Sequence, residues 1–139
     1  MSPSQSKSRQ PKSNRPQPSQ RVVDLQAVLA TQPGAVSGTH PATPRVFHYK
    51  IAGKTFAILA AQKSEFVMLK CDPHLVEILR EQYAGVGHRT HLDRRYWIAI
   101  DLDSDVPPDE IARLAAHSHE QVRATLTRKQ QAELAALTA

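Results

Sequence analysis

The chain has 139 residues, of which 40% are hydrophobic and 22% charged, with 18 Lys and Arg against 13 Asp and Glu. This length fits one domain around one hydrophobic core. No apolar run reaches the roughly 18 residues that a membrane-spanning helix needs, and the first residues lack the apolar stretch of a secretory signal. The single cysteine, Cys71, excludes an internal disulfide framework and is typical of a reducing compartment. We therefore expect a cytoplasmic protein with no membrane partner.

The formal net charge is +5 and the sequence pI is near 9.7, which favours an acidic partner such as nucleic acid. Most of this excess lies at the N-terminus. Residues 1–20 are rich in Ser, Pro and Gln and contain no acidic, aliphatic or aromatic side chain, so they predict a disordered basic tail. The tail is either a solubilising leader or an arm for nucleic acid. The five basic residues that carry the excess are Lys7, Arg9, Lys12, Arg15 and Arg21.

The first half of the remaining chain predicts one helix followed by an antiparallel meander. Apolar residues at helical spacing indicate a helix over 22–29, which Pro33-Gly34 ends. Residues 35–45, with their Gly and Pro, are predicted to be a loop. From Val46 onward apolar residues alternate, with a turn at Gly53. The strands expected in this part cover residues 47–51, 56–60 and 66–71.

The second half predicts two helices around a strand pair, and then a short terminal helix. Pro73 suits the first turn of a helix that Gly85 and Gly87 close. Pro107-Pro108 and the acids after them begin the next helix, because negative charge in the first turn complements the helix dipole. The segment 127–130 resembles a capping box. The strand pair between the helices is expected at residues 88–92 and 96–102.

These elements predict an α+β fold in the order α-β-β-β-α-β-β-α, with an antiparallel sheet and helices packed on one face. The expected domain organisation is a tail over 1–20, a folded domain over 21–127, and a short C-terminal helix or extension over 128–139.

Several ungapped stretches, in the same order, resemble those of a known family. They are residues 49–57 (YKIAGKTFA), 69–73 (LKCDP), 79–83 (LREQY), 91–97 (HLDRRYW) and the segment around His117-Ser118. From about residue 22 to residue 126 the chain resembles the MmcQ/YjbR family of small bacterial proteins. The resemblance implies a compact α+β fold described as a double-wing DNA-binding architecture. The basic tail is a departure, since typical members start close to the first helix.

The segment 88–102 predicts a hairpin whose register follows from its pattern. A three-residue loop over 93–95 pairs Leu92 with Tyr96 and His91 with Trp97. Ile98 and Ile100 then face the helices, and Trp97 faces outward.

This outward face is the candidate nucleic-acid interface. Arginines at a hairpin tip can lie along phosphates, while an aromatic ring stacks on a base or sugar. In the alternative interpretation Trp97 packs beneath the loop 35–45 and the arginines form a solvated turn. The candidate residues are Arg89, His91, Arg94, Arg95 and Trp97.

Metal-binding patterns in the sequence are incomplete. Cys71-x-x-His74 and His88-x-x-His91 approach a zinc-ligand spacing, but the second pair falls on opposite faces of a strand. The aspartates of residues 101–105 lack the Gly and Glu of a calcium loop. We expect no metal and no cofactor.

Catalytic patterns are equally weak. There is no glycine-rich phosphate loop. Ser118 lies between His117 and His119 on a predicted helix, where adjacent side chains point about 100° apart, so no nucleophile and base pair is indicated. The sequence therefore predicts a protein that is not an enzyme.

Two functions follow. The first is a non-catalytic, monomeric DNA-binding protein that contacts phosphates through the hairpin wing, with the tail as a second contact. The alternative is a non-catalytic protein-interaction or small-ligand module that uses the open sheet face around Trp97.

Overall fold

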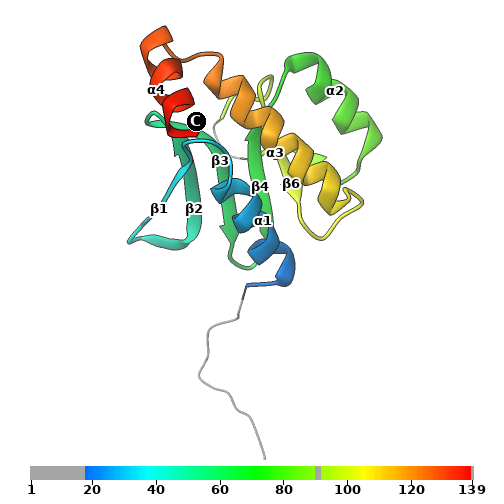
Figure 1. The fold of residues 1–139 in the computed structure, drawn as a ribbon. Coiled ribbons are helices and arrows are strands. Elements are labelled where there is room, and N and C mark those ends of the chain that lie inside the picture. Colours follow the sequence, from blue (N-terminus) through cyan, green and yellow to red (C-terminus); the bar gives the residue numbers. More distant parts are fainter. Residues whose placement is uncertain (1–17, 90–91, 139) are drawn as a thin grey trace, which may run out of the picture.

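The structure, a computed structural model, describes residues 18–89 and 92–138. It confirms the α+β class with an antiparallel sheet, adds one strand to the predicted order, and has a helix in the segment where a short C-terminal helix or extension was expected (Figure 1). The elements are α1 (Gln20–Ala30), β1 (Val36–His40), β2 (Thr43–Ile51), β3 (Lys54–Ala61), β4 (Glu65–Lys70), α2 (Pro73–Gln82), β5 (Val86–Gly87), β6 (Trp97–Asp101), α3 (Pro108–Arg123) and α4 (Arg128–Thr138).

The strands form one sheet in the order β1-β2-β3-β4-β6-β5, and every neighbouring pair is antiparallel. Helices α1 and α3 lie side by side across one face of the sheet (Figure 1). Between them and the sheet, Leu29, Phe56, Leu69 and Ile100 are fully buried. Each such side chain contributes about 1.5–3 kcal/mol through removal from water, so this layer stabilises the packing of the helices on the sheet.

The helix starts follow the capping chemistry of the sequence. Asp72 precedes Pro73 and its carboxylate accepts the backbone N–H of His74 at 2.9 Å. At α4, the Thr127 hydroxyl accepts the N–H of Gln130, and the Gln130 amide oxygen accepts the N–H of Thr127, both at 3.1 Å. The predicted capping box is confirmed.

The loop predicted over 35–45 is wrong, because β1 forms a hairpin with β2 there, turning at Pro41-Ala42. All five residues of β1 are exposed. The strand is therefore held by backbone hydrogen bonds to β2 and buries no apolar face, which explains why no alternation marked it.

The hairpin predicted over 88–102 is also wrong in its pairing. Strand β5 has only two residues, and Val86 lies opposite Ile100 and Gly87 opposite Ala99. The predicted orientation of β6 is nevertheless confirmed, since Ile98 and Ile100 belong to the core.

A helical turn replaces the predicted loop over 93–95. The carbonyl oxygen of Asp93 accepts the N–H groups of both Tyr96 and Trp97 at 3.0 Å. The Asp93 carboxylate also accepts the N–H of Arg95 at 2.9 Å. Because these bonds fold the chain locally, Leu92 does not pair with Tyr96.

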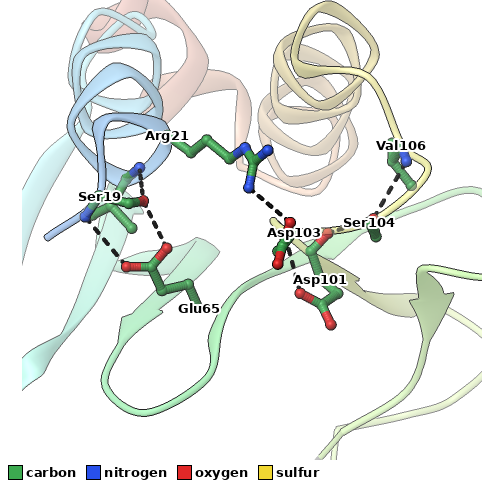
Figure 2. A network of polar contacts seen from close by, with 8 residues as sticks. Ser19, Arg21, Glu65, Asp101, Asp103, Ser104 and Val106 are labelled. Carbon is green, nitrogen blue, oxygen red and sulfur yellow. Dashed lines mark hydrogen bonds and ion pairs between the residues drawn. The ribbon is translucent and has the colours of Figure 1, made fainter.

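The two ends of the described chain are both fixed to the domain. Residues 1–17 of the predicted tail lie outside the described residues, whereas Ser19 caps α1 and binds the Glu65 carboxylate through its hydroxyl at 2.6 Å (Figure 2). At the other end, Leu134 of α4 packs into the core against Gly34. Across residues 18–89 and 92–138, every helix is too short or too polar to traverse a bilayer.

Candidate nucleic-acid interface

A groove of about 480 Å³ runs between α2 and the turn over 93–96. Its charged side chains are three arginines against one glutamate, so the groove is positive. The turn contributes the two predicted arginines, and α2 contributes a third from its last turn. The lining residues are Pro73, His74, Val76, Glu77, Arg80, Arg94, Arg95 and Tyr96.

Arg80 holds the turn in place. Its Nη2 donates to the carbonyl oxygen of Arg94 at 2.9 Å and to that of Trp97 at 3.3 Å. Burial, followed by the nearby charge of Arg94, lowers the pKa of Arg80 below the usual arginine value. A guanidinium remains charged after such a shift, so Arg80 adds positive charge at the base of the groove.

Arg95 is oriented by Asp93. Two guanidinium nitrogens of Arg95, Nε and Nη2, donate to the Asp93 carboxylate at 3.2 and 2.9 Å. Hydrogen bonds from Arg95 hold the pKa of Asp93 below its usual range, and the same bonds raise the pKa of Arg95. The pair is exposed and therefore adds little stability. Its main effect is to place the guanidinium at the mouth of the groove, 5.4 Å from the Tyr96 ring centre.

Trp97 is half-buried in a neighbouring pocket of about 310 Å³. The pocket shares Pro73 and Tyr96 with the arginine groove, so the two hollows adjoin. The alternative in which Trp97 packs beneath residues 35–45 is wrong, because strands β2, β3 and β4 separate β6 from β1. The other residues that line the pocket are Lys70, Asp93, Gln121 and Thr125.

Arg89 lies apart from this site. Its guanidinium stacks on the Phe66 ring, 4.2 Å from the centroid. Phe66 lies opposite Asp101 in the sheet, at the far end of β6 from Trp97, a separation of about 13 Å along the strand. His91 lies outside the described residues. The structure thus brings together Arg94, Arg95 and Trp97 of the predicted set.

Sequence reasoning missed Arg80, His74 and Tyr96 as groove residues. Arg80 is a basic residue in the last turn of α2, a position that the helix dipole alone can explain. Arg80 lines the groove because the turn over 93–96 packs against α2. No local sequence pattern predicted that contact. Tyr96 was expected to begin the strand over 96–102, but lies in the turn before β6 and is 39% exposed.

The sheet face that carries Trp97 is largely covered near its centre. Met68 and Ala99 lie opposite each other on this face and are only 2% and 4% exposed. The face expected to be open is therefore closed at these two residues, whereas Ile58, opposite Met68 on β3, is only half-buried.

The candidate nucleophiles and bases of the sequence have structural partners. The fully buried Ser118 hydroxyl donates to the Phe56 carbonyl at 2.5 Å and accepts the N–H of Lys70 at 2.8 Å. His117 Nε2 accepts the N–H of Asp72 at 3.3 Å. Cys71 is buried, and burial raises its pKa to about 11, which keeps the thiol protonated.

The histidines and aspartates singled out as metal-ligand candidates do not converge. Within the described ranges, no three side chains of His, Cys, Asp or Glu are grouped so that they could hold an ion. His88 Nε2 lies 2.5 Å from the Leu92 carbonyl oxygen. Asp101 accepts the N–H of Asp103, which in turn pairs with Arg21 (Figure 2).

The YjbR family model matches residues 30–121, which include all of the groove. The chain belongs to the YjbR family. It is 28% identical over 101 residues to the uncharacterised protein YjbR of Escherichia coli strain K12, covering 72% of this chain and 85% of that one. The resemblance found in the sequence is confirmed.

Solved structures agree with this assignment. The crystal structure of Deinococcus radiodurans protein DR2400, a DUF419 domain, superposes with a TM-score of 0.74 at 25% identity. That likeness covers 82% of this YjbR-family chain and 87% of the other. A Pseudomonas syringae protein, at a TM-score of 0.55 and 20% identity over 63% of this chain and 86% of its own, shares the fold.

Proposed function

We propose that this YjbR-family protein is a non-catalytic DNA-binding protein that holds the phosphate backbone in the groove between α2 and the turn over 93–96. One observation carries the proposal: Arg80, Arg94 and Arg95 line a single groove beside an exposed tyrosine. Neutralising phosphates with such side chains releases counterions, which supplies sequence-independent affinity.

The three arginines have different roles in this proposal. Among the described residues no carboxylate pairs with the Arg94 guanidinium, so Arg94 is the main phosphate contact. Arg95 exchanges the Asp93 carboxylate for a phosphate, which keeps its two-pronged geometry. Arg80 stays with the carbonyl oxygens above it and fixes the turn.

Aromatic side chains extend the contact beyond phosphate. Tyr96 is 39% exposed at the groove, and the half-buried Trp97 lines the adjoining pocket. Both can stack on a sugar or on an unpaired base. Such stacking does not depend on the base sequence. The family resemblance implies a double-wing architecture, and in our proposal the turn over 93–96 lies against a duplex. We propose that the protein acts in this way as a cytoplasmic monomer.

Charge reversal tests this proposal with a matched control. The double variant Arg94→Glu/Arg95→Glu is compared with Arg128→Glu/Lys129→Glu, which makes the same change in net charge at two exposed positions on α4. Fluorescence anisotropy with a labelled duplex at about 50 mM salt gives the affinities. We expect at least a tenfold loss for the double variant and less than a twofold change for the control. Absence of binding by the wild type, or equal losses in both variants, contradicts the proposal.

A second candidate function is a module that binds a small ligand in the Trp97 pocket. The observation in its favour is a hollow of about 310 Å³ that combines an indole, the Lys70 ammonium and the Asp93 carboxylate. Because Trp97 is the only tryptophan, its fluorescence reports on this pocket directly. Quenching of this fluorescence by small ligands that Lys70→Met weakens, together with DNA affinity indifferent to Arg94→Glu/Arg95→Glu, favours this second function.

A further inference from the structure

An apolar slot of about 260 Å³ lies between α1 and α3. These two helices cover one face of the sheet (Figure 1). Leu25 and Val28 of α1 form one wall, and Pro108, Ile111 and Ala112 of α3 form the other, with Leu102 also lining the slot. The volume suits one or two small side chains. It is smaller than the 300–1,000 Å³ of typical sites for drug-sized ligands.

The rim of the slot is acidic. Arg21, Asp24 and Asp109 stand around it, but the Arg21 guanidinium is already engaged by Asp103 at 3.0 Å (Figure 2). Asp24 accepts only the neutral Gln20 side-chain amide, at 2.8 Å, so its charge and that of the exposed Asp109 carboxylate remain to face an occupant. An apolar side chain flanked by a positive charge therefore fits this slot in both shape and charge.

We propose that the slot binds the protein's own N-terminal tail, with a proline ring in the slot and the adjacent basic side chain on the acidic rim. The tail has Pro3, Pro11, Pro16 and Pro18, four basic residues before Pro18 and no acid. Pro11-Lys12 and Arg15-Pro16 each set a proline beside a basic residue. A proline-rich segment is pre-organised, so it loses less entropy when it binds.

The position of the tail's attachment supports this occupant. Ser19 is tied to Glu65 at the start of α1, and Asp24 at the rim lies about 7.5 Å further along the helix. The eight residues from Pro11 to Pro18 span up to about 27 Å, which is enough to return to the slot. Tethering also gives the tail a millimolar effective concentration that a separate peptide lacks.

This contact stands apart from the proposed DNA binding. The arginine groove lies at the Trp97 end of β6, whereas Asp101 and the root of the tail lie at the other end. If DNA is bound, its phosphates compete with Asp24 and Asp109 for the same tail cations. The slot then acts as a holding site for the tail when no nucleic acid is present.

Paramagnetic relaxation in the full-length protein tests the proposal. A spin label on Ser8→Cys reports on the tail, because the native Cys71 is buried and stays unlabelled. We expect the methyl signals of Leu25, Val28 and Ile111 to lose intensity. The matched control carries the same label in a tail whose Lys7, Arg9, Lys12 and Arg15 are changed to Gln, and there the signals recover by at least half.

A second variant checks the rim itself. Asp24→Asn/Asp109→Asn keeps the fold, since both side chains are exposed, and is expected to restore the same methyl signals. Equal intensity losses in all three proteins overturn the proposal, because they show only the proximity of an undocked tail. A loss that grows with protein concentration assigns the slot to the tail of a second copy and also overturns the intramolecular contact.

Discussion

Arg80 supports the backbone of Arg94 from below. The Nη2 of Arg80 donates to the Arg94 carbonyl oxygen at 2.9 Å, and to that of Trp97 at 3.3 Å. The residue proposed to hold a phosphate is thus positioned by a second arginine, fourteen residues earlier, on another element. The Arg80 Nε is buried without a hydrogen-bond partner in the described structure, so the side chain is fixed by packing and by these two bonds.

Replacing Arg80 and Arg94 in turn distinguishes a residue that holds the turn over 93–96 in place from one proposed to contact phosphate. Arg80→Met removes the donor to both carbonyl groups, and we expect a loss of about 1–2 kcal/mol in the free energy of unfolding. Arg94→Met removes a guanidinium at the groove and is expected to change that free energy by less than about 0.5 kcal/mol. Urea denaturation measures both. Equal stability of the two variants contradicts the supporting role of Arg80.

Ser118→Ala tests the bond that joins α3 to two strands. The buried hydroxyl satisfies the carbonyl of Phe56 on β3 and the N–H of Lys70 on β4, so its removal leaves both unpaired. We expect a loss of about 1–3 kcal/mol in unfolding free energy. Ser37→Ala, on the fully exposed strand β1, is the control and should cost less than about 0.5 kcal/mol. A loss no larger than the control's refutes the structural assignment of Ser118.

Two glycines with similar backbone conformations distinguish strain from steric overlap. Gly34 and Gly53 have φ of 74° and 79°, so alanine is strained at either position. A Cβ added at Gly34 would lie 1.9 Å from Cδ1 of Leu134 on α4. A Cβ added at Gly53 would have no neighbouring atom within 4 Å. Thermal unfolding should show a larger loss for Gly34→Ala than for Gly53→Ala, by at least 1 kcal/mol or so.

The double variant Gly34→Ala/Leu134→Ala provides the check. Compared with the Leu134→Ala single variant, Gly34→Ala should cost less than it does in the wild type, since the overlap is relieved. Equal losses for the two single glycine variants, with no coupling to Leu134, show instead that α4 does not pack at this point.

Asp105 makes stability depend on pH in the acid range. Its carboxylate accepts the backbone N–H groups of Ala84 and Gly85, and these bonds hold its pKa below the usual aspartate value. A depressed folded-state pKa gives stability that is present above about pH 4 and is lost as the pH falls through the folded value. Between about pH 6 and pH 2 the free energy of unfolding should therefore fall less steeply for Asp105→Asn than for the wild type. Superimposable profiles contradict this linkage.

The sequence was most informative where chemistry is local. Pro73 after Asp72 and the Thr127–Gln130 capping box each marked a helix start, because the signal and its structural effect lie within four residues. Strand β1 carried no such signal, because its five residues are all exposed and its stability comes from pairing with β2.

The candidate site was predicted in part for the same reason. Arg94, Arg95 and Trp97 were identified as neighbours because they are adjacent in sequence. The predicted hairpin failed, since the alternation of apolar residues in β6 is also satisfied by pairing with β4 on its other edge. The hydrogen bonds to Asp93 instead form a helical turn. Arg89 stacks on the Phe66 ring and not beside Trp97, where it was expected.

The salt dependence of DNA affinity tests the phosphate contacts most directly. Each phosphate neutralised contributes about 0.9 to the slope of log affinity against log salt concentration. We expect Arg94→Gln to flatten the slope by about 0.9 and Arg94→Gln/Arg95→Gln by about 1.8, with Arg128→Gln unchanged. Parallel lines for the wild type and the double variant would show that neither arginine contacts phosphate, and would contradict the proposed DNA-binding groove.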